Sequence, residues 1–207
     1  MKKLLHVGCG LKHLSETTQG FGAGEWQEIR LDIDASVQPD ILASTTDMSG
    51  VETASVDAIF SAHNLEHLYA YQVPIALAEF RRVLKPDGFA VITCPDLRAI
   101  CALVAEDKLL DPFGQSPAGP IAPMDVLYGY RPALAQGAHS MAHRCGFTAK
   151  VLTQVVRAAG FVGTASARRG HPSFDLWLVA TVSLRTRQQL NGKRCFQATR
   201  LMVGDAG

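Results

Sequence analysis

The sequence lacks a long apolar run and a strong excess of charge of either sign. No stretch approaches the roughly 20 apolar residues of a membrane-spanning helix, and Gly8, Gly10 and Lys12 interrupt the apolar start before it reaches the length of a signal peptide. The chain has 20 lysines and arginines against 19 acidic residues, a formal net charge of +1. We therefore expect a protein that neither spans a membrane nor is secreted, and that has no general affinity for nucleic acid.

Cysteine is scarce, and its spacing indicates neither a disulfide framework nor a structural metal site. The number is odd and no Cys-x-x-Cys pair occurs among Cys9, Cys94, Cys101, Cys145 and Cys195. This pattern favours a reducing, cytoplasmic location. The length of 207 residues, with 47% hydrophobic and 19% charged residues, is typical of one globular domain with one site.

Apolar segments that alternate with helical patterns predict a parallel sheet. Residues 4–7 form a short apolar run that ends in a glycine loop, as a buried strand does. Further strands are expected at residues 28–32, 40–43, 56–61, 89–94 and 176–182. Helices are expected from residue 72 until a turn at residues 85–88, and after Thr148 until Gly160. This alternation is typical of a sheet covered by helices on both faces.

Residues 98–146 break the alternation. Prolines and glycines alternate between Pro95 and Phe147, which argues against a regular crossover helix through the middle of the segment. We expect an irregular insert with few internal hydrogen bonds inside a single domain of residues 1–184. It would act as a mobile lid over the ligand site, with a dimer surface as the alternative. Residues 185–207 are expected to form a polar C-terminal tail.

Two glycines directly after the first strand predict a ligand-binding loop. Gly8 and Gly10 let backbone amides approach a ligand closely, and a helix following Gly10 would add its positive dipole end. His13 stands where the dinucleotide pattern has its third glycine, so no pyrophosphate is indicated. Asp32 lies 22 residues beyond Gly10, at a strand end from which a carboxylate can bind both hydroxyls of a ribose. We therefore expect a nucleoside-containing ligand, with Asp34 as the alternative to Asp32.

Four segments in register resemble the class I S-adenosylmethionine-dependent methyltransferases. They are residues 5–10 (LHVGCG), 31–34 (LDID), 56–68 (VDAIFSAHNLEHL) and 80–92 (FRRVLKPDGFAVI), and residues 147–182 resemble the closing helix and antiparallel hairpin of that family. The resemblance implies an α/β, Rossmann-like, seven-stranded and mostly parallel sheet with an antiparallel last strand. It also implies S-adenosyl-L-methionine as the cofactor and a methyltransferase that acts on a small-molecule acceptor.

The resemblance implies the site residues as well. The cofactor would contact the glycine loop, the end of the second strand, a segment that frames adenine and the end of the fourth strand, at His6, Gly8, Cys9, Gly10, Asp32, Asp47, Met48, Ala62, His63 and Asn64. His6 and Lys12 depart from the family motif, which usually has an acidic residue and a glycine there. His63 is the leading candidate for a catalytic residue. Substrate contacts are expected in the insert, at Tyr128, Arg131, His139, His143 and Arg144.

Three other interpretations compete with this one. The string from His63 to His67 spells the inverted zinc-protease motif, but the chain offers no further glutamate downstream of residue 106, so we expect no metal. A nicotinamide or flavin oxidoreductase is disfavoured by the missing third glycine. A catalytically silent, S-adenosylmethionine-binding partner subunit stays open because of His6. The sequence does not decide the oligomeric state, and a homodimer is one alternative.

Overall fold

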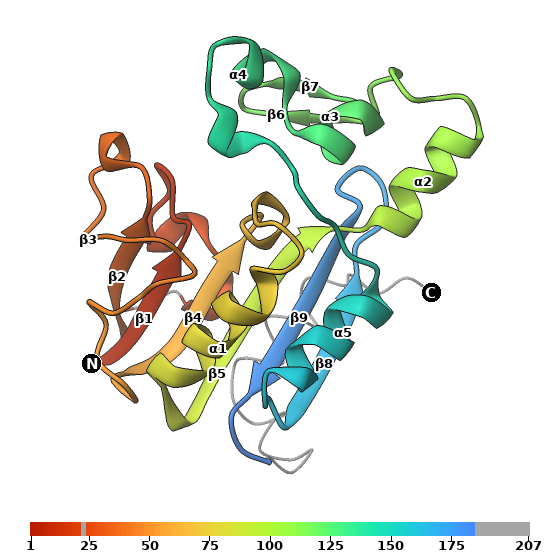
Figure 1. Cartoon of the computed structure of the whole chain (residues 1–207). Helices are drawn as coiled ribbons and strands as arrows, with labels where there is room; N and C mark the ends of the chain where they lie inside the picture. Colours follow the sequence, from red (N-terminus) through yellow and green to blue (C-terminus); the bar gives the residue numbers. More distant parts are fainter. Residues whose placement is uncertain (22–23, 185–207) are drawn as a thin grey trace.

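A seven-stranded sheet forms the centre of the computed structural model, which describes residues 1–21 and 24–184 (Figure 1). Its strand order is β3-β2-β1-β4-β5-β9-β8. The strands are β1 (Lys2–Val7), β2 (Trp26–Asp32), β3 (Ile41–Leu42), β4 (Val56–Ala62), β5 (Leu84–Pro95), β8 (Gly163–Arg168) and β9 (Asp175–Thr181). Strands β1 to β5 are parallel, and β9 runs antiparallel between β5 and β8. The predicted Rossmann-like sheet is confirmed.

Two helices cover one face of the sheet, as the sequence pattern predicts. They are α1 (Val73–Val83) and α5 (Ala149–Ala158), which lie side by side in front of the strands in Figure 1. Leu77 and Phe80 of α1 and Leu152 of α5 are fully buried in one core cluster with residues of the sheet. Thr148 caps α5, since its hydroxyl accepts a hydrogen bond from the Val151 amide at 3.4 Å.

The second face of the sheet differs from the expectation. It carries an aromatic cluster in which the rings of Phe21 and Phe89 stack with centroids 6.1 Å apart. The helix expected after Gly10 is not formed: residues 11–21 contain only two short 3-10 helices, η1 (Leu14–Glu16) and η2 (Gln19–Phe21). Glycines at positions 20, 22 and 24 in this short connection disfavour an α-helix. The expected dipole end at the glycine loop is therefore wrong.

The turn predicted at residues 85–88 is a bulge within β5. Leu84 pairs with Val56, whereas Phe89 pairs with Ala58, so residues 85–88 lie outside the regular ladder with β4. From Phe89 onward the pairing of β5 is regular, with β4 as far as Thr93 and with β9 as far as Pro95. The predicted strand at residues 89–94 is thus confirmed, and the preceding residues extend it.

Residues 98–146 are folded rather than irregular. They carry most of α2 (Leu97–Ala105), and then β6 (Gly114–Ser116), β7 (Gly119–Ile121), α3 (Pro123–Tyr128), α4 (Arg131–Ala135) and η5 (His139–Met141). The part after α2 lies beyond the end of the sheet toward which β4 and β5 point (Figure 1). Backbone hydrogen bonds and a buried Asp125 hold it, so the expectation of few internal hydrogen bonds is wrong.

The insert leaves and rejoins the sheet at one place. Asp96, directly after β5, forms a bridge with Phe147, and the Leu97 amide donates to the Phe147 carbonyl at 3.0 Å. In the described part of the chain, no helix has the length and apolar character needed to cross a bilayer. The tail predicted at residues 185–207 lies outside the described residues.

Candidate functional site

The loop after β1 places two glycines in the left-handed region, at φ +65° for Gly8 and +52° for Gly10. A Cβ on Gly8 would lie 2.7 Å from Cγ of Asn64, which follows β4, so only glycine permits this contact. A Cβ on Gly10 would meet no atom within 4 Å. The side chain of Cys9 between them is buried. The loop therefore packs against β4 at Gly8 and presents its backbone to open space at Gly10.

Asp32 holds this loop from the end of β2. Its Oδ2 accepts the Gly10 amide at 2.8 Å, and its Oδ1 accepts the Asp34 amide at 3.0 Å. Asp34 instead caps the 3-10 helix η3 (Ala35–Val37) by accepting the Ser36 amide at 2.8 Å, and it is exposed. Of the two candidate carboxylates, only that of Asp32 contacts the glycine loop.

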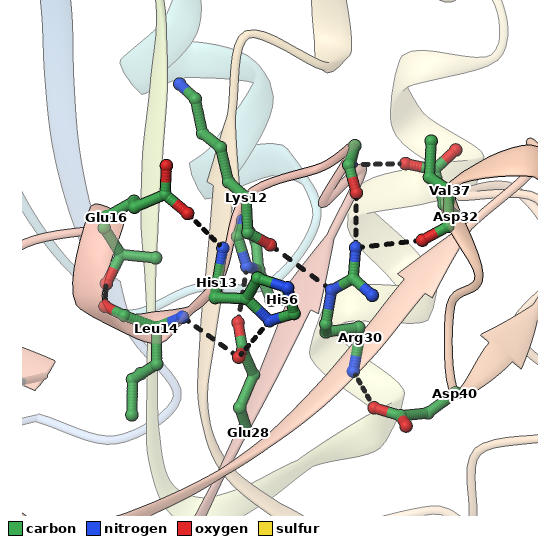
Figure 2. A network of polar contacts seen from close by, with 12 residues as sticks. His6, Lys12, His13, Leu14, Glu16, Glu28, Arg30, Asp32, Val37 and Asp40 are labelled. Atoms are coloured by element: carbon green, nitrogen blue, oxygen red, sulfur yellow. Dashed lines mark hydrogen bonds and ion pairs between the residues drawn. The ribbon is translucent and has the colours of Figure 1, made fainter.

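Arg30 joins the glycine loop to the loop after β2. Its guanidinium donates to the carbonyl oxygens of four residues, Gly10, Lys12, Val37 and Gln38. Figure 2 shows the Arg30 side chain between the two loops. The Arg30 amide also donates to Asp40 at 2.7 Å. Arg30 is nearly buried, so this arrangement makes one rigid unit of the two loops.

His6 lies beneath the glycine loop and not on its surface. It is 1% exposed, and its Nδ1 lies 2.8 Å from Oε1 of Glu28 on β2 (Figure 2). Glu28 also accepts the Leu14 amide at 2.9 Å. Burial lowers the pKa of His6 more than Glu28 raises it. A side chain so enclosed supports the loop, which corrects the expectation that His6 touches the cofactor.

Glu28 and Arg30 were missed in the sequence, although a signal for them exists. Together with Asp32 they alternate along β2, and alternate residues of a strand share one face. All three side chains bond to residues of the segment 6–16. Polar residues at three alternate positions of a strand inside the sheet therefore indicate a loop lying against that face.

The predicted adenine segment reaches the site through Thr45. The side chain of Met48 is fully buried in the core and therefore offers no surface to a ligand. The Met48 amide donates a hydrogen bond to Glu79 at 2.8 Å. Asp47 is exposed and accepts the Ser49 amide at 3.1 Å. Asn64 Nδ2 donates to Thr45 Oγ1 at 3.1 Å and thus brings this segment against the end of β4.

His63 follows β4 directly and has an unusual backbone, with φ +50°. Its Nδ1 lies 3.3 Å from Glu66 Oε1 and its Nε2 lies 3.4 Å from Asp175 Oδ1. Burial lowers the pKa of His63, but the two carboxylates outweigh it and the pKa is raised. Left-handed backbone in a residue other than glycine is uncommon and concentrates at functional sites.

A cavity of about 400 Å³ lies next to His63, between the end of the sheet and the insert. Its lining comes from four parts of the chain and includes His63, Glu66, His67, Pro95, Tyr130, His143 and Phe174. Of the five substrate contacts expected in the insert, only His143 lines this cavity. Phe113 and Tyr130 of the insert also line the wall. The Phe174 side chain was not anticipated, because contacts between distant segments leave no local pattern.

The other four expected substrate residues serve different roles. Tyr128 and His139 are exposed. Arg131 pairs with the buried Asp125 at 2.7 Å. The guanidinium of Arg144 lies 5.1 Å from the ring centre of Tyr69 and donates to the His67 carbonyl at 2.6 Å. In this structure they brace or border the insert instead of lining the cavity.

Residues 5–92, which cover β1 to β4 and most of β5, match the family model described as a methyltransferase domain. The matched segment is a methyltransferase domain, and the order and directions of the seven strands agree with that match. Both findings support the predicted family. A search of curated proteins gave no significant match.

Many solved structures share the fold of the methyltransferase. The PH0226 protein of Pyrococcus horikoshii OT3 is 15% identical with a TM-score of 0.58, and the match covers 87% of this chain and 82% of that one. A SAM dependent methyltransferase of Archaeoglobus fulgidus is 13% identical with a TM-score of 0.57, covering 87% and 86%. The 1,6-didemethyltoxoflavin-N1-methyltransferase of Burkholderia thailandensis is 16% identical with a TM-score of 0.53, covering 86% and 70%. At such identities the likeness establishes the fold.

The residues of the methyltransferase fit S-adenosylmethionine. No other atom lies within 4 Å of the place that a Cβ on Gly10 would take. Each carboxylate oxygen of Asp32 accepts one backbone amide, and a carboxylate oxygen can accept further hydrogen bonds, here from ribose hydroxyls. Ala62 and Asn64 complete the edge at the end of β4. The cofactor is S-adenosylmethionine.

Proposed function

We propose that the methyltransferase transfers a methyl group to a small-molecule acceptor bound in the cavity beside His63. The supporting observation is the position of the 63–64 corner: Asn64 packs on Gly8 of the donor loop, while His63 lines the cavity. A volume of about 400 Å³ lies in the range of small-molecule sites. The Burkholderia neighbour was solved with 1,6-didemethyltoxoflavin and S-adenosylhomocysteine bound, which supports a small acceptor on this fold.

In this proposal the donor lies along the strand ends. Backbone groups of Gly8, Cys9 and Gly10 contact its methionine part, and Asp32 binds the ribose. The adenine lies near the segment of Asp47. Met48 supports that segment from the core, as His6 supports the glycine loop. Because Arg30 ties the loops after β1 and β2 together, both ends of the donor meet surfaces that are already in place.

S-adenosylmethionine supplies a methyl group on a positively charged sulfur, so the leaving group needs no further activation. The chain must therefore orient the two reactants and exclude water. We assign to His63 the contact with the nucleophilic atom of the acceptor. Its ring is held from two sides by Glu66 and Asp175, which fixes the direction in which it can meet the acceptor.

Residues 111–145 of the insert are proposed to cover the reactants. It supplies Tyr130 and His143 to the cavity wall, and it is tied to the sheet by hydrogen bonds from the Arg144 and Cys145 amides to the Glu66 carbonyl, at 2.8 Å and 3.2 Å. A cover of this kind excludes water from the transfer. A cytoplasmic location and a small-molecule partner belong to the same proposal.

Calorimetry tests the proposal with S-adenosylmethionine, S-adenosylhomocysteine and NAD. The first two should bind and the third should not; binding of NAD alone would favour an oxidoreductase. His63→Ala should keep donor affinity within about threefold, because the assigned contact is to the acceptor, and should slow formation of S-adenosylhomocysteine by roughly 100-fold. A silent partner subunit would bind the donor and form no S-adenosylhomocysteine with any acceptor.

A further inference from the structure

We propose that Glu66, His67 and His143 bind a divalent transition-metal ion such as zinc in the wall of the cavity. One ligand atom of each lies within 4.8 Å of the others, and all three residues line the cavity. Two histidines and one glutamate form a ligand set used by catalytic zinc sites, which leave a further position open. Binding of the ion does not depend on methyl transfer.

Glu66 is a buried carboxylate without a hydrogen-bond partner. The residue is 1% exposed, and among the described residues neither of its side-chain oxygens accepts a hydrogen bond. His63 Nδ1 lies 3.3 Å from Oε1 but outside hydrogen-bond geometry, and it leaves Oε2 without a cation. A buried carboxylate is costly unless it is paired, hydrogen-bonded or bound to a metal. An ion at Oε2 would satisfy the free oxygen while His63 keeps Oε1.

Both histidines present the nitrogen that a metal requires. His67 Nδ1 lies 3.3 Å from the Ala142 carbonyl, and His143 Nδ1 lies 2.6 Å from the Val126 carbonyl. A carbonyl oxygen only accepts, so Nδ1 carries the proton in each ring and Nε2 keeps its lone pair. Histidines that bind metals through Nε2 are commonly oriented in this way by a backbone carbonyl.

The fold brings the three ligands together from two distant segments. Glu66 and His67 belong to the 3-10 helix η4 (Leu65–His67), directly after β4. The insert returns His143 to this helix because the neighbouring Arg144 amide donates to the Glu66 carbonyl at 2.8 Å. Ligand atoms around zinc lie about 3.4 Å apart, so atoms that now lie within 4.8 Å of one another must close by up to about 1.4 Å. The half-buried position of His143 allows this movement.

This ligand set differs from the one in the inverted zinc-protease motif. That motif would use the histidines at positions 63 and 67, whereas His63 lies between Glu66 and Asp175, at 3.3 Å and 3.4 Å. The ring centroids of His67 and His143 lie only 4.8 Å apart. Two of the proposed ligands, Glu66 and His67, therefore lie within the motif, whereas the third is His143 of the insert and not His63.

Cobalt titration tests the site without any methyl donor. Metal-free protein without an affinity tag should bind one equivalent of Co²⁺, with a visible absorption band typical of low coordination, and one equivalent of Zn²⁺ should remove the band. His143→Gln should weaken Zn²⁺ binding by about 100-fold or more, since loss of a mere outer-sphere partner already costs 10–100-fold. His139→Gln is the matched control, because His139 is exposed in the same segment and should bind Zn²⁺ as the wild type does.

Two outcomes would overturn the site. One is wild-type protein that binds no stoichiometric ion, and the other is His143→Gln protein that binds Zn²⁺ as tightly as the wild type. Glu66→Gln should also lose the ion, and its far-ultraviolet circular dichroism shows whether it has folded. Calorimetry with S-adenosylhomocysteine on the metal-free protein separates failure of this site from failure of the proposed methyl transfer, because donor binding uses the loops at Gly10 and Asp32.

Discussion

The amide of Gly10 donates a hydrogen bond to the carboxylate of Asp32 over 2.8 Å, so the loop after β1 and the end of β2 meet at one point. Asp32→Ala removes this anchor and the proposed ribose contacts. Two charge-assisted hydrogen bonds contribute about 1.5–3 kcal/mol each, so S-adenosylmethionine should bind roughly 100-fold to 10,000-fold more weakly in calorimetry. Asp34→Ala is the control and should change the affinity less than about threefold. A larger loss for Asp34→Ala would move the ribose contact to that residue.

The two glycines of the donor loop should respond differently to alanine. Gly8→Ala places a methyl group 2.7 Å from Asn64 Cγ at φ +65°, and should lower the free energy of unfolding by about 2–3 kcal/mol. Gly10→Ala, at φ +52° with no atom within 4 Å, should cost only about 1 kcal/mol. Its methyl group enters the proposed donor space, so donor binding should fall more than about tenfold. Unchanged binding by Gly10→Ala would place the donor elsewhere.

Burial of His6 should make the fold less stable in acid. The pKa of His6 is lowered from 6.5 by burial, helped by Arg30 and Lys12 and opposed by Glu28. Below pH 6.5 the unfolded chain therefore binds more protons at this residue than the folded chain does, and the free energy of unfolding falls as the pH falls. Urea unfolding between about pH 5 and 7 measures this slope.

His6→Gln isolates that contribution, because glutamine does not titrate. Its free energy of unfolding should depend less steeply on pH than that of the wild type over the same range. The exposed His139→Gln should keep the wild-type slope. Equal slopes for the wild type and His6→Gln would mean that protonation of His6 does not differ between the folded and unfolded chains.

Asp125 should control how firmly the insert is held. Its buried carboxylate accepts the Ala122 amide at 2.9 Å and the Arg131 amide at 3.1 Å, and it pairs with the Arg131 guanidinium. Asp125→Ala leaves these donors without an acceptor, at a cost of about 2–4 kcal/mol. Limited proteolysis should then cut residues 111–145 faster, while the sheet stays resistant.

The same assay tests the lid. Cleavage of the wild type within residues 111–145 should slow when S-adenosylhomocysteine is added, because a filled site holds its cover in place. Arg98→Ala, at the first turn of α2 and outside that range, should leave the response to ligand as in the wild type. Identical cleavage rates with and without ligand would favour a structural insert that is indifferent to the donor.

Local patterns predicted most of the sheet and its two covering helices. The apolar runs of β1, β4 and β9 and the apolar face of α1 depend on period and length, which a sequence shows directly. The glycine loop and Asp32 followed from their order along the chain. The helix expected after Gly10 was wrong because it was inferred from the glycine loop alone, whereas glycine recurs in the connection that follows.

The cavity proposed for the acceptor could not be predicted in the same way. Its wall joins Glu66 to His143 through a hydrogen bond between Arg144 and Glu66, 78 residues apart (144 minus 66), and neither segment signals the other. Conspicuous side chains of the insert, such as Tyr128 and Arg131, turned out to be exposed or paired. Polarity marks a candidate residue, but only tertiary contacts decide which way it faces.

The bridge between Asp96 and Phe147 has a consequence for how this enzyme can diversify. Since both ends of the insert are fastened at a single point of the sheet, residues 98–146 can grow, shrink or be exchanged without shifting the register of any strand. The proposed donor contacts all precede residue 65, whereas much of the wall of the proposed acceptor cavity belongs to the insert. Selection for a new acceptor can thus change the insert while the residues proposed to bind the methyl donor stay the same.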